Sequence, residues 1–305
     1  MRTSLSLLCV SVLCCPAAAF ATVRVVPNDQ PTIQSAIDAS MAGDTVLVQP
    51  GAYREHLLFR GRAVTLRSVA GPALTMIDGG GTDTVVSFIA GERGDSVIEG
   101  FTITGGAHPV HAGGVHIEGA SPVLRDNVIR GNLGGRLGHG ISLVGSDHAL
   151  IEANEISGNR SWLAGNGAGG GGGIGVLGPG AVSIRGNRIL GNWVSRYSSG
   201  GGIYLFDSGA TQIVGNLISG NGARLAGGGI AIHGLSDARI ENNLIVNNRV
   251  IEPGFGGGVH WLIRPGSSGP ALVGNTIAGN LASAGAGVYA DGEDYRARIV
   301  NNLVL

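Results

Sequence analysis

Arginine and aromatic side chains recur in the loops of the middle and C-terminal parts of this chain. Five successive loops each carry one arginine: Arg136, Arg160, Arg196, Arg224 and Arg249. Three of the loops also carry aromatic residues: Trp162, Trp193 with Tyr197, and Phe255. A guanidinium group forms paired hydrogen bonds with a carboxylate, and an aromatic ring offers a flat face to a sugar ring. These residue types favour binding of an acidic polysaccharide, whereas a simpler interpretation leaves the arginines solvated and the rings packed on their own loops.

Further candidate side chains lie on segments next to these loops, where apolar residues alternate with small or polar ones: His116, Tyr204, His260 and Tyr289. Because alternate residues of a strand point to opposite faces, we predict that these four point outward and that Trp261 points into the core. If the loops stack along one edge, they form a single groove. The predicted substrate-binding set is Arg136, Arg160, Trp162, Trp193, Arg196, Tyr197, Tyr204, Arg224, Arg249 and His260.

The acidic residues of the same region are scattered: Glu118, Asp126, Asp147, Glu152, Asp207 and Asp237. A cation such as Ca²⁺ needs several oxygen ligands close together, and no strand places two or three carboxylates at such a spacing. We therefore predict neither a metal nor a cofactor. A site composed from several coils would not be visible in the sequence, so the catalytic residues stay unassigned.

A hexapeptide with an asparagine at each end recurs at intervals of 27 to 33 residues. Its copies are NVIRGN at 127, NEISGN at 154, NRILGN at 187, NLISGN at 216, NLIVNN at 243 and NTIAGN at 275, and Asn302 begins a seventh. A second element recurs in step with it, as GGGIGV at 171, GGGIYL at 200, GGGIAI at 227 and GGGVHW at 256. Both elements alternate with the period of a strand. Short strands repeating without helices between them bury their apolar faces by stacking coil on coil, so the sequence predicts an all-β fold, a parallel β-helix solenoid.

The first asparagines of the hexapeptides are predicted to form a structural ladder: Asn127, Asn154, Asn187, Asn216, Asn243 and Asn275. Asparagine tolerates the left-handed backbone of a sharp turn, and amides stacked in register can hydrogen-bond along the axis. We expect the aliphatic residue two positions later to point into the core. The closing Gly-Asn pair should turn the chain out of the sheet, and the following Gly-Gly pair should return it with φ values that other residues avoid.

Residues 1–21 have the pattern of a secretory signal peptide. Arg2 precedes an apolar run over residues 5–14, and Ala19-Phe20-Ala21 is a small-x-small cleavage site. We therefore predict a secreted protein, extracellular or at the cell surface, or periplasmic. All three cysteines lie within this segment, which predicts a mature protein without disulfides. No later stretch is apolar over the length that a membrane span requires.

Residues 22–44 are predicted to hold an N-terminal strand and an amphipathic capping helix, and residues 45–305 the β-helix. Within residues 31–42, Pro31 suits the first helical position, and Ile33, Ala36 and Ile37 mark one apolar face. Such a helix would cover the core and the free strand edges at the end of the solenoid. Because the chain stops inside a hexapeptide, we expect further coils, a cap or an anchoring domain beyond it.

The composition limits the partners. The 20 basic residues are all arginine and stand against 21 acidic residues, so the net charge is close to zero. This balance argues against a general role in binding nucleic acid or membrane surfaces. Although the chain has 56 glycines, 43% of its residues are hydrophobic and only 13% are charged, which is typical of a folded protein.

Several stretches carry a resemblance to a known family: TIQSAIDASMAGDTVLVQPGAYRE at 32–55, GFTITGG at 100–106, and the repeated GGGI and hexapeptide elements. With them the chain resembles the pectin-lyase-like superfamily and, more narrowly, the bacterial secreted right-handed parallel β-helix repeat proteins. The resemblance covers essentially all of the mature chain and implies a right-handed parallel β-helix. It says little of activity, because this fold carries lyases, hydrolases, epimerases, adhesins and proteins without known activity.

The same resemblance allows two enzymatic mechanisms to be considered. GHGISLVGS at 138–146 is similar to a strand of polygalacturonases and draws attention to His139, but Gly113-Gly114 stands where those enzymes carry paired aspartates. Hydrolysis by two carboxyl groups then lacks both its acid and its base. Pectate lyases use a basic residue as general base, and here arginine is available but lysine is not. Three classes remain: a module that binds polysaccharide without turnover, which we favour, a lyase or epimerase acting on an acidic glycan, and a structural rod or adhesin passenger.

Overall fold

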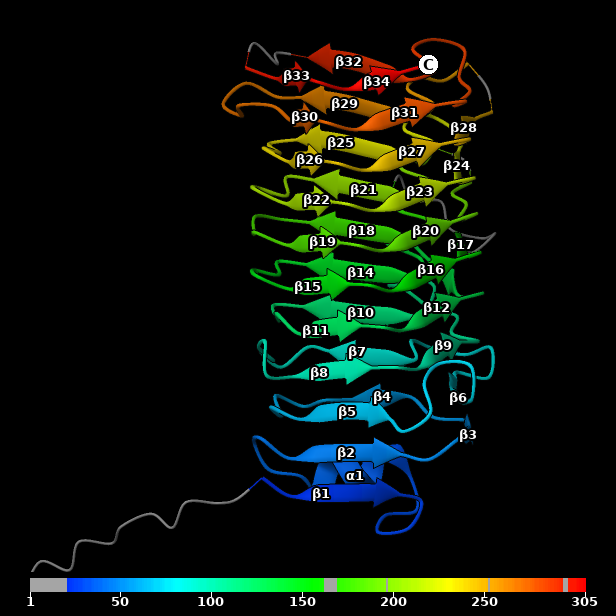
Figure 1. The fold of residues 1–305 in the computed structure, drawn as a ribbon, viewed down its shortest axis with the longest axis vertical. Helices are drawn as coiled ribbons and strands as arrows, with labels where there is room; N and C mark the ends of the chain where they lie inside the picture. The colour runs from blue at the N-terminus through cyan, green and yellow to red at the C-terminus, as the bar shows by residue number, and fades with distance from the viewer. Residues whose placement is uncertain (1–20, 162–168, 196, 252, 293–295) are drawn as a thin grey trace, which may run out of the picture.

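The computed structural model describes residues 21–161, 169–195, 197–251, 253–292 and 296–305. Each coil contributes short strands to three long sheets, and strands of successive coils pair in parallel (Figure 1). The coils stack into an elongated rod with the first strand at one end and the C-terminus at the other. The predicted right-handed parallel β-helix is confirmed.

Three sheets run along the rod. Sheet A has 11 strands: β1 (Val23–Val26), β2 (Thr45–Val48), β5 (Thr65–Ser68), β8 (Val97–Glu99), β11 (Val123–Arg125), β15 (Leu150–Glu152), β19 (Ser183–Arg185), β22 (Gln212–Val214), β26 (Arg239–Glu241), β30 (Ala271–Val273) and β33 (Arg298–Val300). Sheet B has 10 strands: β3 (Gly51–Tyr53), β6 (Thr75–Asp78), β9 (Thr102–Thr104), β12 (Val128–Arg130), β16 (Glu155–Ser157), β20 (Arg188–Leu190), β23 (Leu217–Ser219), β27 (Leu244–Val246), β31 (Thr276–Ala278) and β34 (Leu303–Val304).

Sheet C has nine strands: β4 (Leu57–Leu58), β7 (Val86–Phe88), β10 (Val115–Glu118), β14 (Ile141–Val144), β18 (Ile174–Leu177), β21 (Ile203–Phe206), β25 (Ile230–Gly234), β29 (Val259–Ile263) and β32 (Val288–Gly292). Two short pairs lie in the connections from sheet B to sheet C: β13 (Leu133–Gly134) with β17 (Arg160–Ser161), and β24 (Gly222–Ala223) with β28 (Arg249–Val250). The chain therefore passes from sheet C to sheet A, then to sheet B, and through a loop to the next strand of sheet C.

The core between the sheets is a set of aliphatic columns. The central residue of eight successive sheet B strands is a buried isoleucine, and neighbouring strands hold these residues in register: Ile77, Ile103, Ile129, Ile156, Ile189, Ile218, Ile245 and Ile277. Six of these are the aliphatic residues of the hexapeptides, as predicted. Trp261 is also buried in the core, with 2% of its surface exposed. Fully buried side chains of this size each contribute about 1.5–3 kcal/mol of hydrophobic stabilisation.

Both asparagines of the hexapeptide are buried and face the neighbouring coils. Asn187 Nδ2 donates to Ile151 O at 2.8 Å and to Asn216 Oδ1 at 3.0 Å, while its Oδ1 accepts from Asn154 N at 2.9 Å. The closing asparagines repeat this pattern in a second column, in which Asn192 Nδ2 donates to Asn221 Oδ1 at 3.0 Å. The amide thus supplies hydrogen bonds that turning backbone groups lack. This role of the closing asparagine was not predicted.

The left-handed residue of each turn is not the asparagine of the column but the residue before it. Asp126, Ala153 and Asn242 have φ of 55°, 53° and 52°, and each directly precedes a column asparagine. The prediction that the asparagine itself takes this conformation was therefore wrong. An asparagine in the left-handed region would aim its amide away from the neighbouring coils. Because the preceding residue makes the bend, the asparagine amide can form hydrogen bonds with those coils.

The glycines before each sheet C strand serve two purposes. Gly200 has φ of 71°, which glycine adopts without strain. The φ of Gly201 does not lie in this left-handed range, yet a Cβ atom there would lie 2.5 Å from Gly228 O of the next coil. The expectation that the glycine pair is needed for its φ values was only partly right. In the coils with three consecutive glycines, the first is needed for its conformation, and the next two let adjacent backbones approach closely.

The helix α1 (Ile33–Ala39) is shorter than the predicted segment 31–42. Thr32 is its N-cap: Thr32 Oγ1 accepts from Ser35 N at 3.1 Å, and Ser35 Oγ accepts from Thr32 N at 3.2 Å. Pro31 therefore lies outside the helix, because this capping box fixes the start two residues later. The predicted apolar face is buried and packs against the N-terminal end of the core. No helix within the described part of the chain is long and apolar enough to cross a membrane.

Candidate functional site

Loop residues of successive coils pair in register outside the three sheets. We call this the edge row: Ala107, Leu133, Arg160, Trp193, Gly222, Arg249 and Leu281. It contains three of the residues predicted to bind substrate. Their spacing in the chain differs from coil to coil, but parallel pairing brings them into one line along the rod.

Trp193 lies over the glycine of the next coil. A Cβ atom on Gly222 would be only 2.0 Å from Trp193 Cζ3, so the indole occupies the space that a side chain there would need. One coil further, the Arg249 guanidinium lies 5.4 Å from the centre of the Trp193 ring, within the range of a cation–π contact. Trp193 and Arg249 are thus held together, while Arg160 is exposed and forms no ion pair with the described residues.

The outer face of sheet C carries two columns of side chains. Parallel pairing places one column at Ser87, His116, Ser142, Gly175, Tyr204, Ala231, His260 and Tyr289. The second is Glu118, Val144, Leu177, Phe206, His233, Leu262 and Asp291. Tyrosine and histidine therefore gather over β21, β25, β29 and β32, on the face where Tyr204 and His260 were expected.

Tyr204, His233 and His260 form a continuous hydrogen-bonded chain on this face. Tyr204 Oη is 3.3 Å from His233 Nδ1, and His233 Nε2 is 3.2 Å from His260 Nδ1. Burial lowers the pKa of His233 to about 4, and burial with the neighbouring His233 lowers the pKa of His260 to about 4. Burial, with a smaller effect of Asp207, raises the pKa of Tyr204 to about 12. All three groups are therefore neutral near pH 7.

A cavity of about 500 Å³ opens beside this chain of side chains. Its walls include Arg136, Tyr197, Tyr204, Phe206, Leu177 and His233. Gly175 leaves a gap in the first column between Ser142 and Tyr204, and Leu137 packs over it, since a Cβ atom there would lie 2.7 Å from Leu137 Cδ1. One cavity is therefore lined by the guanidinium of Arg136, by aromatic rings and by the neutral imidazole of His233.

The structure divides the predicted substrate-binding residues into groups. Arg136, Tyr197 and Tyr204 line the cavity, and His260 lies behind it in the hydrogen-bonded chain. The edge row holds Arg160, Trp193 and Arg249, while the exposed Arg224 follows β24 and contacts neither group through a hydrogen bond or ion pair that joins described residues. Trp162 and Arg196 lie outside the described residues.

Comparison with known proteins agrees with this architecture. The family described as "right handed beta helix region" matches residues 94–304, which is more than half of the chain. The chain belongs to this family. No curated protein matches the sequence.

Several solved structures are similar to this chain. Pectate lyase Pel9A is similar with a TM-score of 0.51 and 14% identity, over 93% of this chain and 80% of that one. A rice weevil pectin methylesterase has a TM-score of 0.37 and 13% identity, over 92% and 87%. The A-module of the Azotobacter vinelandii mannuronan C-5 epimerase AlgE6 has a TM-score of 0.32 and 18% identity, over 90% and 94%. At 14% identity the likeness to Pel9A supports the fold of this β-helix protein and says nothing of its activity.

His233 is the site residue that the sequence reasoning missed. A strand of sheet C has two outward positions, and only the first was considered, which in β25 is Ala231. The stretch GGGIAIH already contained the signal, because His233 is two residues beyond Ala231 and therefore on the same face. Phe206 and Leu177 occupy the same second position on β21 and β18.

A second histidine group lies nearer the N-terminal end of sheet C. The rings of His111 and His116 stack at 4.0 Å, and His116 Nδ1 is 2.8 Å from Ser142 Oγ while its Nε2 is 3.4 Å from Glu118 Oε2. This order of groups is that of a serine hydrolase triad, but Ser142 is only 1% exposed, so no substrate reaches its hydroxyl. Ser142 also accepts from the backbone N–H of Ala112 at 3.3 Å, which is a structural role.

His139 does not face the cavity. It is fully buried, and neither ring nitrogen has a hydrogen-bond partner in the described part of the chain. Burial lowers its pKa to about 3, so the ring is neutral. The structure therefore offers no support for His139 as a catalytic residue. Among the described residues, no group of three or more His, Cys, Asp or Glu side chains is placed to hold a metal ion.

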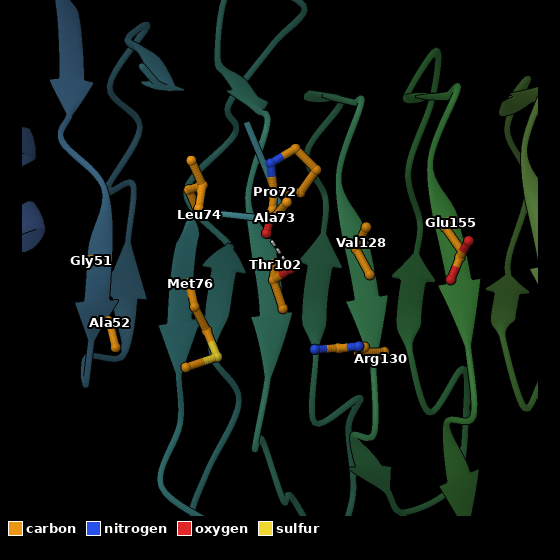
Figure 2. A pocket seen from close by; sticks show the side chains of 10 residues that line it. All are labelled: Gly51, Ala52, Pro72, Ala73, Leu74, Met76, Thr102, Val128, Arg130 and Glu155. Carbon is orange, nitrogen blue, oxygen red and sulfur yellow. Dashed lines mark hydrogen bonds between the residues drawn. The ribbon is translucent and has the colours of Figure 1, made fainter. Parts of the chain in front are cut away.

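Another hollow, of about 460 Å³, crosses the outer face of sheet B (Figure 2). Ala52, Met76, Thr102 and Val128 form its floor in register, and Thr102 Oγ1 donates to Pro72 O at 2.7 Å, which fixes the loop at its rim. Its lining contains no aromatic ring or histidine. Arg130 and Glu155 lie in its lining, but it offers no ring that could stack on a sugar, so the cavity over sheet C is the stronger candidate for binding a polysaccharide.

Proposed function

We propose that this β-helix protein is a secreted module that binds an acidic polysaccharide in the cavity over sheet C. The observation that carries the proposal is the meeting of Arg136 with Tyr197 and Tyr204, which lie two coils further along the chain, around one cavity of about 500 Å³. The guanidinium would pair with a sugar carboxylate, and the tyrosine rings would stack on sugar faces. The edge row, with Arg160, Trp193 and Arg249, would bind the chain beyond the cavity.

The distribution of ion pairs supports this assignment. On sheet A three outward arginines pair with glutamates of neighbouring coils: Arg125 lies 2.6 Å and Arg67 3.4 Å from Glu99, and Arg185 lies 2.8 Å from Glu152. Arg136 forms no ion pair or hydrogen bond with the side chains that the structure describes. A cation without a counter-charge beside exposed aromatic rings suits an anionic ligand, whereas a paired cation does not.

Calorimetric titration of oligogalacturonate and of alginate oligomers into the protein tests the proposal. We expect micromolar to millimolar affinity that weakens as salt is added, because partly exposed ion pairs are screened. Arg136→Ala should weaken binding about fivefold, which corresponds to roughly 1 kcal/mol for an exposed charge pair. Tyr197→Ala, at a residue that is 75% exposed, should weaken binding without changing stability.

The matched control is Arg185→Ala, which removes one positive charge from sheet A, away from the cavity. It should leave the affinity unchanged. No detectable binding by the unaltered protein, or equal losses in Arg136→Ala and Arg185→Ala, would contradict the proposal and favour the structural rod. Loss of binding in Arg160→Ala and Arg249→Ala but not in Arg136→Ala would move the site from the cavity to the edge row.

A further inference from the structure

We propose that His108 is a positioning residue for Arg136, and that it supports this arginine at the cavity only while its ring is uncharged, so that acid weakens ligand binding. The inference rests on the proposed binding of an acidic polysaccharide and assigns a regulation to that site. His108 lies in the loop between β9 and β10, one coil before Arg136, and is not part of the cavity wall.

The ring of His108 closes a tight turn in its own loop. The backbone N–H groups of Val110 and His111 both donate to His108 Nδ1, at 3.1 Å and 2.8 Å. An imidazole nitrogen accepts hydrogen bonds only when it carries no proton. The single ring proton is therefore on Nε2, which lies 3.7 Å from Asp83 Oδ1. The closed turn thus requires a neutral His108.

This turn supports the backbone of Arg136. The N–H group of Arg136 donates to Val110 O at 2.9 Å, and the N–H group of Gly135 donates to His111 O at 3.0 Å. The two segments are also in close contact, because a Cβ atom on Gly135 would overlap Pro109 O. The position of the arginine at the cavity therefore depends on the turn of the preceding coil.

A second proton on His108 would open the turn. An Nδ1–H group would face the two backbone N–H groups and leave them without their acceptor, while the carboxylate of Asp83 would favour the charged ring. The charge would lie beside His111, whose ring centre is 4.8 Å from that of His108. Burial and the neighbouring His108 lower the pKa of His111, so a charge on both rings is disfavoured. Because the closed turn excludes the second proton, lowering the pH favours the open turn and removes the support of Arg136.

Other groups near the loop and the cavity can be kept apart from this effect by the choice of pH. The titratable and charged side chains around the loop are His56, Asp83, His111, His116, Glu118 and Arg136. Burial and the neighbouring His111 lower the pKa of His116 to about 4, and burial lowers the pKa of His233 and of His260 to about 4. These three rings stay largely neutral at pH 5, and sugar carboxylates stay ionised there.

His108→Asn is the decisive variant. The asparagine Oδ1 takes the place of Nδ1 and can accept the same N–H groups, as in turns closed by asparagine, but it gains no proton. Calorimetric titration with oligogalacturonate at pH 7.5 and at pH 5 is the assay. The affinity of the unaltered protein should fall at pH 5 by up to about fivefold, the effect expected for loss of the Arg136 contact. The affinity of His108→Asn should be the same at both pH values.

Three further variants show whether His108 acts through the arginine. Arg136→Ala should bind equally weakly at both pH values, because the contact that acid removes is already lost. His108→Ala should bind weakly even at pH 7.5, because the turn then lacks its acceptor. His148→Asn is the matched control, since His148 is exposed in a turn between sheets C and A, and its φ of 68° is one that asparagine tolerates. This control should keep the pH dependence of the unaltered protein.

Hydrogen exchange without ligand distinguishes this proposal from the proposed function. In peptides covering residues 108–113 and 133–137, protection should fall at pH 5 in the unaltered protein, after correction for the intrinsic exchange rate, and should stay unchanged in His108→Asn. Equal protection at both pH values, or a pH dependence of binding that survives in His108→Asn, would overturn the proposal. A protein that loses this protection in acid but binds no oligomer at either pH would contradict the proposed function and leave the acid-sensitive turn standing.

Discussion

Replacing Asn187 with alanine should destabilise the middle of the rod more strongly than any outward substitution nearby. Asn187 is 1% exposed, and its amide serves both neighbouring coils. Alanine removes the donor to Ile151 O at 2.8 Å and the acceptor for Asn154 N at 2.9 Å. It also removes the amide pairs with Asn216 at 3.0 Å and with Asn154 at 3.1 Å.

The magnitude follows from the groups left without partners. Ile151 O and Asn154 N lose the hydrogen bonds to this amide, and each buried, unsatisfied group costs about 1–3 kcal/mol. Asn154 Nδ2 keeps Leu124 O at 2.9 Å, and Asn216 Oδ1 keeps the backbone N–H of Asn187 at 2.8 Å. The expected loss in free energy of unfolding is therefore about 2–6 kcal/mol, from the two orphaned backbone groups.

Urea unfolding followed by circular dichroism measures this loss. Ser157→Ala is the matched control, because that side chain points outward and, among the described residues, forms a hydrogen bond only with Glu155 Oε1, at 3.2 Å. Asn187→Asp is a second variant of equal size. It keeps the acceptor, removes both amide donors and buries a charge, so it should be at least as destabilising. Equal unfolding midpoints for Asn187→Ala and Ser157→Ala would refute the reasoning, since the column would then carry no measurable stability.

Two further predictions concern acid stability and the glycines. For His139 the folded pKa of about 3 lies below the unfolded value of 6.5, so the unfolded chain binds the extra proton in between. Stability should fall as pH drops from 6.5 towards 3, by up to about 5 kcal/mol from this residue alone. Urea unfolding at pH 7 and pH 4 checks this, and a His139→Leu variant with the same pH dependence would count against it. Gly201→Ala should cost about 1–3 kcal/mol, because its Cβ would meet Gly228 O at 2.5 Å. In contrast, Gly186→Ala should be destabilising through its φ of 63° and not through contacts, as no atom lies within 4 Å of the added Cβ. Urea unfolding midpoints of the two single variants measure these losses, and an unchanged midpoint in either variant would contradict the cause given for it.

The sequence by itself determined the coil. An asparagine and an isoleucine two positions later specify a buried polar residue just before a short strand and a core residue within that strand. This information is local, because alternation alone decides which side chains of a strand face inward. Repetition of the unit then leaves stacking as the way to bury its apolar face. The same argument placed Tyr204 and His260 on the outer face.

Tertiary structure decided which outward residues meet. Arg136, Tyr197 and Tyr204 share a cavity, and Arg160 aligns with Trp193, although the coils between them differ in length. The repeat period does not predict the direction of a side chain within a longer loop, because alternate residues face opposite sides in a strand but not in a loop. Hydrogen bonding between coils fixes the register of the strands and so brings His233 against Tyr204 and His260. The local sequence thus specifies the structure of each coil. The side chains of the site come from different coils, and the stacking of the backbone determines which of them come into contact.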